Sequence, residues 1–369
     1  MIKDEKLRDA IWEEIKQLSD YTSTSENLKT ADLKRIEILN VEHMGIENLD
    51  GIENLVNLTE LFLGNNQINS IEDVDFSKLN KLIYLFLSHN QIKRFDRVNF
   101  SDLNSLRHLN IKGNQIASLK DLDFSGLKSL TTLTLSDNQI KSLDEADFSG
   151  LHSLTTLTLG NNQITNLEGV DFSSLNSLTT LTLSNNQIKS LEEVNFGGLD
   201  NLKILNLQDN QIVSLKNADF SGLGSLTYLN LGGNQIENLK GVDFSDLHSL
   251  THLNLSGNQI VSLEGSDFSG LNSLGELSLQ MNQITNLKGT NFNTLDNLTN
   301  LFLTVNQIDT MNWFKRALSG LKIDDILTIY MYGNPVTGTA EYDTVTAEIK
   351  EGINTNIGFK PPPSNATKK

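Results

Sequence analysis

The tripeptide Asn-Gln-Ile recurs along this chain at a constant interval of 24 residues. It begins at Asn66, Asn90, Asn114, Asn138, Asn162, Asn186, Asn210, Asn234, Asn258, Asn282 and Asn306. Each copy follows the pattern L-x-x-L-x-L-x-x, as in LTTLTLSDNQI at residues 130–140. A fixed period of this kind is typical of repeat architectures, in which each unit packs only on its neighbours. Because no insertion or deletion interrupts the eleven copies, the chain must stack them in one register.

The residues of each repeat predict its local structure. The L-x-L segment alternates apolar and polar residues, which indicates a short strand with every second side chain pointing inward. The Asn at the following turn can satisfy the backbone donors and acceptors that the bend leaves open, so stacked Asn residues should form a hydrogen-bonded ladder. Ten repeats also carry a Phe ten residues after the Asn, at Phe76, Phe100, Phe124, Phe148, Phe172, Phe196, Phe220, Phe244, Phe268 and Phe292. We expect these rings to form a spine on the wider side of one elongated core.

This pattern resembles the leucine-rich repeat family in its 24-residue form, over roughly residues 31–340. The resemblance implies an α/β solenoid, a curved horseshoe with a parallel β-sheet on its concave side, a helical N-terminal cap and an irregular C-terminal cap. An apolar helical stripe opens the chain at Leu7, Ile11, Ile15 and Leu18. With the I-x-x-L-x-G-I-x-x-L stretch at residues 46–55, this start is similar to the cap of bacterial internalin-like proteins.

The C-terminal end departs from the repeat. MNWFKRALSGL at residues 311–321 predicts a short helix, and ILTIYMYGNPV at residues 326–336 predicts a last degenerate repeat, in which Pro335 should end the strand ladder. A covering helix is predicted to bury one face made of Tyr342, Val345, Ile349 and Ile353.

These features predict four segments along the chain. They are a helical cap at residues 1–30, a repeat solenoid at 31–309, a capping repeat and helix at 310–359, and a disordered tail at 360–369.

Composition excludes several classes of function. The chain has no cysteine, which removes disulfide scaffolds, cysteine metal sites and thiol nucleophiles. A net charge of −17 opposes binding to nucleic acid. No apolar run is long enough for a membrane span, and the acidic, amphipathic start is unlike a secretory signal. We therefore expect a monomer with no nucleic-acid partner and no membrane insertion. It should be cytoplasmic as written, or secreted or at the cell surface if a signal was removed.

Two clusters of acidic, tyrosine and histidine side chains are the candidates for catalysis. Residues 24 apart become neighbours at about 4.8 Å in a stacked sheet. This spacing brings together Glu60, Tyr84 and His108 in one cluster, and Tyr228, His252 and Glu276 in the other. A His–Glu pair can act as base and orienting acid. On an open sheet without a pocket, we interpret both clusters as recognition residues, and we predict no enzyme activity, no catalytic residue, no cofactor and no metal.

The outward-facing strand positions predict a binding surface. They lie six, four, two and one residues before each Asn, and only Glu60, Lys112, Asp137, Asp209 and Glu276 among them are charged. Depletion of charge with enrichment of Tyr and Phe is typical of the core of an interface. We predict a protein ligand on the concave face, with contacts from Phe62, Tyr84, Phe86, His108, Tyr228, His252, Phe302, Tyr330 and Tyr332. A glycan ligand, or an adhesive or structural surface role, is the alternative.

Two further rows of side chains allow other interpretations. Three successive repeats carry Thr-x-Thr in register at residues 132–134, 156–158 and 180–182, an array that resembles some ice-binding faces. An acidic row precedes the Phe spine at Asp75, Asp123, Asp147, Asp171, Asp219, Asp243 and Asp267, with Asn at 99, 195 and 291. Stacked carboxylates could bind Ca²⁺. The replacement of Asp by Asn in three repeats favours a role in capping a short helical turn instead.

Overall fold

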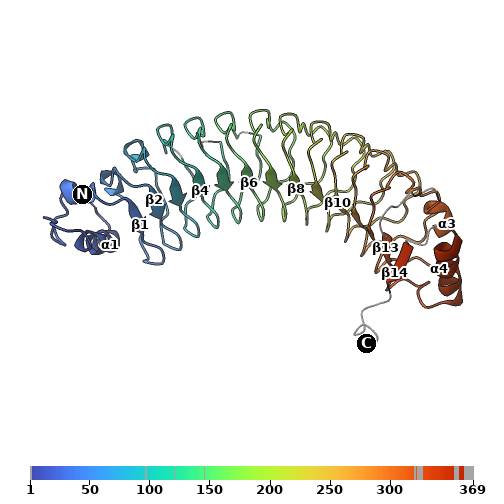
Figure 1. The fold of residues 1–369 in the computed structure, drawn as a ribbon. Coiled ribbons are helices and arrows are strands. Elements are labelled where there is room, and N and C mark those ends of the chain that lie inside the picture. The colour runs from blue at the N-terminus through green and yellow to red at the C-terminus, as the bar shows by residue number, and fades with distance from the viewer. Residues whose placement is uncertain are drawn as a thin grey trace. The chain divides into compact units, whose positions relative to one another are not determined.

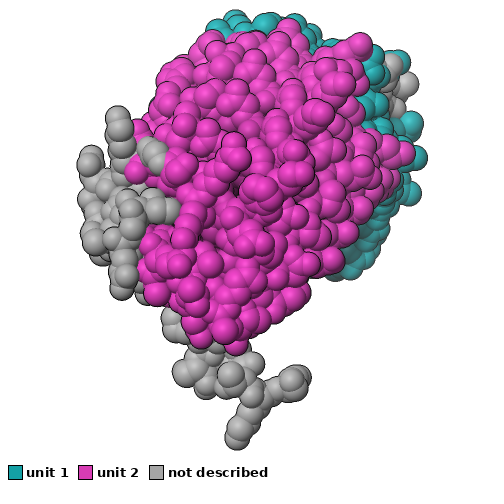
Figure 2. Space-filling model, turned by 90° about the vertical axis from the view of Figure 1, so that its right-hand side faces the viewer, with its two compact units in different colours: residues 1–182 teal, residues 183–369 magenta. Residues whose placement is uncertain are grey.

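The computed structural model describes residues 2–95, 98–120, 122–144, 146–319, 321, 327–352 and 357–360. The chain divides into two compact units, Met1–Thr182 and Leu183–Lys369, which Figure 2 shows in teal and magenta. Each unit is a coil of repeats that contributes one short parallel strand per turn (Figure 1). No helix within the described ranges combines the length and the apolar character needed to cross a bilayer.

The first unit consists of two cap helices followed by a row of parallel strands. Its elements are α1 (Glu5–Lys16), α2 (Thr30–Leu33), β1 (Ile38–Asn40), the 3-10 turn η1 (Ile52–Asn54), β2 (Glu60–Phe62), the 3-10 turn η2 (Phe76–Lys78), β3 (Tyr84–Phe86), β4 (His108–Asn110), β5 (Thr132–Thr134), β6 (Thr156–Thr158) and β7 (Thr180–Thr182). Neighbouring strands pair in sequence order, and from β2 onward they pair residues 24 apart, such as Glu60 with Tyr84. The period of the sequence is therefore the register of the sheet.

Helix α1 closes the apolar end of this unit. Its inner face buries Leu7, Ile11 and Ile15, whereas Leu18 lies beyond the end of the helix and is half-buried. Asp4 caps the helix by accepting a hydrogen bond from the Leu7 amide at 3.0 Å, and its second oxygen accepts one from the Glu47 amide at 2.9 Å. Burial opposes ionisation of Asp4, but these backbone hydrogen bonds outweigh it and lower the pKa of the carboxyl. One side chain thus fixes the helix to the first turn.

The second unit continues with the same repeats and ends in a different cap. Its elements are β8 (Ile204–Asn206), β9 (Tyr228–Asn230), β10 (His252–Asn254), β11 (Glu276–Ser278), β12 (Asn300–Phe302), α3 (Phe314–Ala317), β13 (Leu327–Tyr330), α4 (Ala340–Gly352) and β14 (Ile357–Lys360). Helix α3 lies inside the segment predicted to be helical. Within α4, Ile349 is buried and Tyr342 and Val345 are half-buried, as expected for a covering helix.

Two expectations about this end are wrong. Pro335 does not end the ladder, because β14 pairs with β13 in parallel, Ile357 beside Leu327. The proline lies in the turn after β13, where its missing N–H removes no strand hydrogen bond. Lys360 belongs to β14 and not to the predicted tail. Residues 361–369, Ile353 of the predicted helix, and residues 320 and 326 of the predicted end segments lie outside the described residues.

The core of each unit is built from the repeated Leu, Ile and Phe side chains. The strand leucines are buried, and the spine rings are at most 3% exposed. Adjacent rings lie 5.3 to 6.5 Å apart in the first unit and 5.6 to 6.4 Å apart in the second, as for Phe148 with Phe172 and Phe244 with Phe268. Because these rings pack on those of the next turn, neighbouring repeats cover one another's apolar surface.

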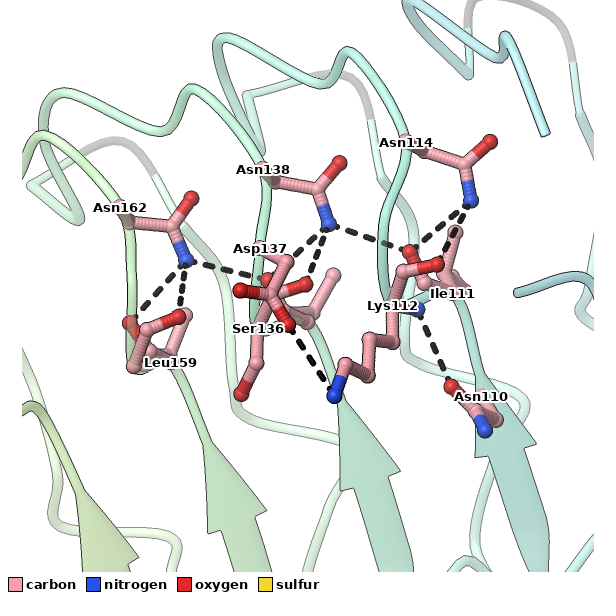
Figure 3. Close-up of polar contacts among 11 residues, drawn as sticks. Asn110, Ile111, Lys112, Asn114, Ser136, Asp137, Asn138, Leu159 and Asn162 are labelled. Carbon is pink, nitrogen blue, oxygen red and sulfur yellow. Dashed lines mark hydrogen bonds and ion pairs between the residues drawn. The ribbon is translucent and has the colours of Figure 1, made fainter. Parts of the chain in front are cut away.

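The predicted asparagine ladder is present, and Figure 3 shows three of its rungs. Asn138 donates from Nδ2 to the Leu135 carbonyl of its own turn at 3.0 Å and to the Ile111 carbonyl of the preceding repeat at 3.1 Å. Its Oδ1 accepts from the Ile116 amide at 3.1 Å. Asn334 adds a rung that the 24-residue spacing did not identify, because its Oδ1 accepts from the Ile308 amide at 3.0 Å. Each buried amide therefore fixes its own turn and joins it to the one before.

The acidic row caps turns and not helices. Among the described turns that follow this acidic row, η2 after Asp75 is a 3-10 turn, and the later copies are simple turns. In these, the Asp carboxylate accepts a hydrogen bond from the amide two residues ahead, as Asp147 does from Ser149 at 2.9 Å. Hydrogen bonds from the side chain and backbone of Ser149 lower the pKa of Asp147, and those from Ser173 lower the pKa of Asp171.

Candidate binding surface on the strands

The outward-facing side chains of the strands form a continuous surface in each unit, called the strand face below. Within most strands the central Leu is buried while the flanking side chains are half-buried, as in Thr132–Thr134. The strands lie along the inner edge of the coil in each unit (Figure 1). The alternation of L-x-L thus places two side chains per repeat on the strand face.

Four aromatic side chains form one cluster on the strand face of the first unit. Phe62 contacts Phe86 edge to face, with ring centroids 5.2 Å apart. Tyr84 contacts Phe86 at 6.2 Å, and its ring stacks on His108 at 4.7 Å with an interplanar angle of 1°. The register brings these residues together, because Phe62 pairs with Phe86 and Tyr84 with His108. We call this group the aromatic cluster.

The environment of His108 favours its neutral form. Burial against the stacked tyrosine ring lowers the pKa of His108, and the nearby positive charge of Arg107 lowers it further. A neutral imidazole lying flat on Tyr84 acts as a continuation of the aromatic surface. The first unit thus presents a nearly uncharged anchor of four rings.

The second unit holds two smaller aromatic pairs. Tyr228 lies beside His252 at 6.1 Å, and Phe302 stacks on Tyr330 at 4.4 Å with an interplanar angle of 15°. Tyr332 follows two residues after β13 and is half-buried. The strand β11 lies between the two pairs, so the predicted residues of this unit do not form one cluster.

The tyrosine–histidine–glutamate rows are in register but do not form hydrogen-bonded acid–base pairs. Glu276 pairs with His252 in the sheet, and Glu60 pairs with Tyr84. The Nδ1 atom of His252 lies 2.9 Å from the hydroxyl of Thr251. In the described part of the chain no group of three acidic or histidine side chains is arranged to hold a metal ion.

The predicted aromatic anchors are less exposed than the sequence indicated. Phe62, Phe86, Phe302 and Tyr330 are each half-buried, because the rings cover one another across neighbouring strands. This stacking depends on side-chain rotamers, which an interval of 24 residues does not reveal.

Three apolar residues that the sequence did not single out are more exposed than these rings. Ile38 on β1 is 53% exposed, Met281 is 62% exposed and Val305 is 50% exposed. Met281 and Val305 also have a left-handed backbone, with φ of 57° and 54°. Other repeats place Asn, Asp, Gly or, at His89, histidine at this position, such as Asn185 and Gly233. The valine at position 305 could have been recognised from the sequence as unusual, since β-branched residues rarely adopt positive φ.

Polar side chains between the aromatic groups are engaged with one another. Lys112 forms an ion pair with Asp137 at 3.1 Å in the first unit (Figure 3). In the second unit Asn230 donates to Gln208 at 3.0 Å, and Asn254 donates to Asn230 at 2.9 Å. These contacts hold the strand face in one arrangement.

Comparison with known proteins agrees with this architecture. The sequence model of the family described as "Leucine rich repeat" matches residues 56–116, 106–164, 128–188, 176–236 and 234–284, which together span well over half of the chain. No curated protein sequence matches the chain.

Several solved structures share the fold. The internalin InlF from Listeria monocytogenes is 24% identical, with a TM-score of 0.67 over 94% of each chain. The leucine-rich repeat domain of APL1B is 20% identical, with a TM-score of 0.68 over 94% of this chain and 96% of that one. TLR13 in complex with ssRNA13 is 28% identical, with a TM-score of 0.68 over 85% of this chain and 48% of that one, so this chain spans about half its length. The repeats, the register and the family match together show that this chain belongs to the leucine-rich repeat family and has an internalin-like fold.

Proposed function

We propose that this protein is a non-enzymatic scaffold that binds a protein ligand on its strand face through aromatic anchors. The aromatic cluster of Phe62, Tyr84, Phe86 and His108 is the observation that carries the proposal. Large rings at charge-depleted positions are the side chains that dominate binding energy in protein interfaces. Leucine-rich repeat proteins are generally interaction scaffolds, which agrees with this assignment.

The rigidity of the strand face supports tight binding by a small number of side chains. The rings are already stacked, and the asparagine ladder fixes the turns behind them. Binding therefore requires little ordering of side chains, and less of the interaction energy is lost as entropy.

Charge argues for a protein and against an RNA ligand. The neighbour TLR13 is in complex with a single-stranded RNA. This chain has a net charge of −17, and Lys112, the one lysine at the outward-facing positions of the eleven regular repeats, pairs with Asp137. Binding of RNA needs clustered Lys and Arg side chains facing the phosphates.

The proposal is tested by capture from cell extracts with three purified proteins. One is the wild type, one carries Tyr84→Ala, Phe86→Ala, Phe302→Ala and Tyr330→Ala, and the control carries Val213→Ala and Val261→Ala. The control residues are exposed apolar side chains outside the strand-face positions, 51% and 49% exposed. Circular dichroism first establishes that all three proteins fold.

We expect a protein that is retained by the wild type and the control and lost by the strand-face variant. Equal retention by all three proteins would place the binding surface elsewhere. Turnover of a substrate that tracks His252→Ala or Glu276→Ala would contradict the non-enzymatic assignment.

A further inference from the structure

A pocket outside the strand face lies at the end of the regular repeats in the second unit. It has a volume of about 390 Å³, within the range of small-molecule sites. Its lining comes from the return segments on either side of β11, between β10 and β11 and between β11 and β12, and from the region of α3. The lining residues are Glu264, Lys288, Gly289, Thr290, Asn291, Asn293, Trp313, Arg316 and Ser319.

The segment at residues 288–291 departs from its repeat in the residues that line this pocket. Two repeats earlier the same positions read Lys240, Gly241, Val242 and Asp243, whereas here Thr290 replaces the valine and Asn291 replaces the aspartate. The acidic row therefore ends before the pocket, and a hydroxyl replaces a methyl group in a buried position. Similar changes occur in other repeats, since Asn also stands in the acidic row at 99 and 195, and Ser266 places a hydroxyl at the valine position one repeat earlier.

The hydroxyl of Thr290 is buried without a hydrogen-bond partner. The residue is 4% exposed, and its Oγ1 has no partner in the described structure. An unsatisfied buried hydroxyl destabilises a protein, and valine, the residue at this position in several repeats, would avoid that loss. Ser266, at the same position one repeat earlier, also has a buried hydroxyl without a partner in the described structure, but of the two residues only Thr290 lines the pocket, where a ligand could supply a partner.

The charges of the pocket differ from those of the rest of the chain. Lys288 and Arg316 both line it and are exposed, and among the described residues neither has an ion-pair partner. Glu264 is the one acidic residue in the lining, so the pocket carries a net charge of about +1, whereas the whole chain has a net charge of −17. This balance suits a ligand with one negative charge better than a doubly charged phosphate.

We infer that this pocket binds an acidic sugar unit, a six-membered ring that carries one carboxylate and several hydroxyl groups. The guanidinium of Arg316 presents paired donors that match a carboxylate, and Lys288 adds a second positive charge. Trp313 is half-buried and offers a flat ring to the apolar face of the sugar. Thr290, Asn291 and Asn293 can exchange hydrogen bonds with the hydroxyl groups.

Fluorescence titration tests this inference directly. The chain has two tryptophans, so Trp12→Phe leaves Trp313 as the only one and makes its emission a report on the pocket. The probes are glucuronate, methyl glucoside and inorganic phosphate. We expect saturable binding of glucuronate, with the neutral sugar and phosphate weaker by about tenfold or more. Phosphate binding as tight as glucuronate, or no saturable response to glucuronate, would overturn the assignment.

Matched variants separate the pocket from general electrostatics. Lys288→Gln and Arg316→Gln should each weaken glucuronate binding by about tenfold. Lys240→Gln removes the equivalent charge two repeats earlier and should leave binding unchanged. An equal effect of Lys240→Gln and Lys288→Gln would show a response to net charge alone and contradict the site.

The variant Thr290→Val distinguishes a role of the Thr290 hydroxyl in ligand binding from a purely structural role. We expect the variant to have a higher urea midpoint, because the unsatisfied hydroxyl is removed, and at the same time a weaker affinity for glucuronate. A more stable variant with undiminished affinity would show that the hydroxyl does not face the ligand and would overturn this part of the site.

Discussion

Val305 combines an exposed apolar side chain with a backbone conformation that disfavours it. Its φ is 54°, and half of the side chain is exposed, so burial does not offset the steric cost. Backbone strain of this kind often occurs at functional sites. Val305 follows Phe302 of the Phe302–Tyr330 stack by three residues, which places it beside the proposed binding surface.

Replacing Val305 by Asn should therefore stabilise the protein. We expect the free energy of unfolding to rise by about 1 kcal/mol, since Asn tolerates the left-handed region. Urea denaturation measures the change. The reciprocal variant Asn185→Val, at φ 55°, should be destabilised by a similar amount. A loss of stability in Val305→Asn would show that the valine makes compensating contacts.

The histidine of the aromatic cluster gives a prediction about pH. Folding lowers the pKa of His108 from its ordinary value of 6.5, chiefly through burial and secondly through Arg107. The unfolded chain therefore takes up the proton more readily, so the stability that neutral His108 contributes is present above pH 6.5 and is lost as the pH falls below it. An NMR titration of the His108 ring should give a pKa below 6.5, and Arg107→Gln should raise it. A pKa above 6.5 would contradict the stacked, partly buried geometry.

At the scale of the repeat, each asparagine of the ladder should contribute more to the stability of the fold than an exposed polar residue does. Asn138→Ala removes the donor to three carbonyls, those of Ile111, Leu135 and Ser136, and the acceptor of the Ile116 amide. We expect the free energy of unfolding to fall by about 2 kcal/mol or more, because these buried backbone groups lose their partners. The neighbouring Asn161→Gly changes an exposed residue at positive φ and should have little effect. Similar losses in both variants, measured in urea, would disprove the special role of the ladder.

The Asp residues of the acidic row should stabilise the protein by hydrogen bonds within their own turns and not by binding calcium. The carboxylates of Asp147 and Asp171 accept hydrogen bonds from Ser149 and Ser173, which lower their pKa values below the ordinary 3.8. This contribution to stability is present above pH 3.8 and is lost as the pH falls through the lowered values. Millimolar Ca²⁺ should leave the melting temperature unchanged, because one oxygen of each carboxylate already accepts the amide of its own turn and, in the described part of the chain, no group of three carboxylates is arranged around a cation. A rise in Tm that Asp147→Asn and Asp171→Asn abolish would indicate a calcium site.

The interval of 24 residues determines most of what sequence alone can predict. It converts sequence separation into strand pairing, so the register of Glu60 with Tyr84 and the ladder of Asn138 follow from it. Prediction from this interval fails where the interval is interrupted. The rung at Asn334 lies 28 residues after Asn306, and β14 follows a helix that no repeat specifies.

Side-chain packing limits the prediction of the binding surface in the same way. The sequence places Phe62 and Phe86 on one face, but their half-burial comes from edge-to-face packing between the rings. The unsatisfied hydroxyl of Thr290 also appears only when burial and hydrogen bonds are known. Sequence thus predicts which residues share a surface, and structure shows how they contact one another.

At the scale of the whole molecule, we expect a protein ligand to bind the strand face. The most direct measurement is the dissociation constant of a captured protein partner for the wild type, for Tyr84→Ala with Phe86→Ala, and for the control Val213→Ala with Val261→Ala. Loss of two central aromatic anchors should weaken binding by about tenfold or more, while the control stays within about twofold of the wild type. A strand-face variant that binds as tightly as the wild type, or a control that weakens binding equally, would contradict the assignment.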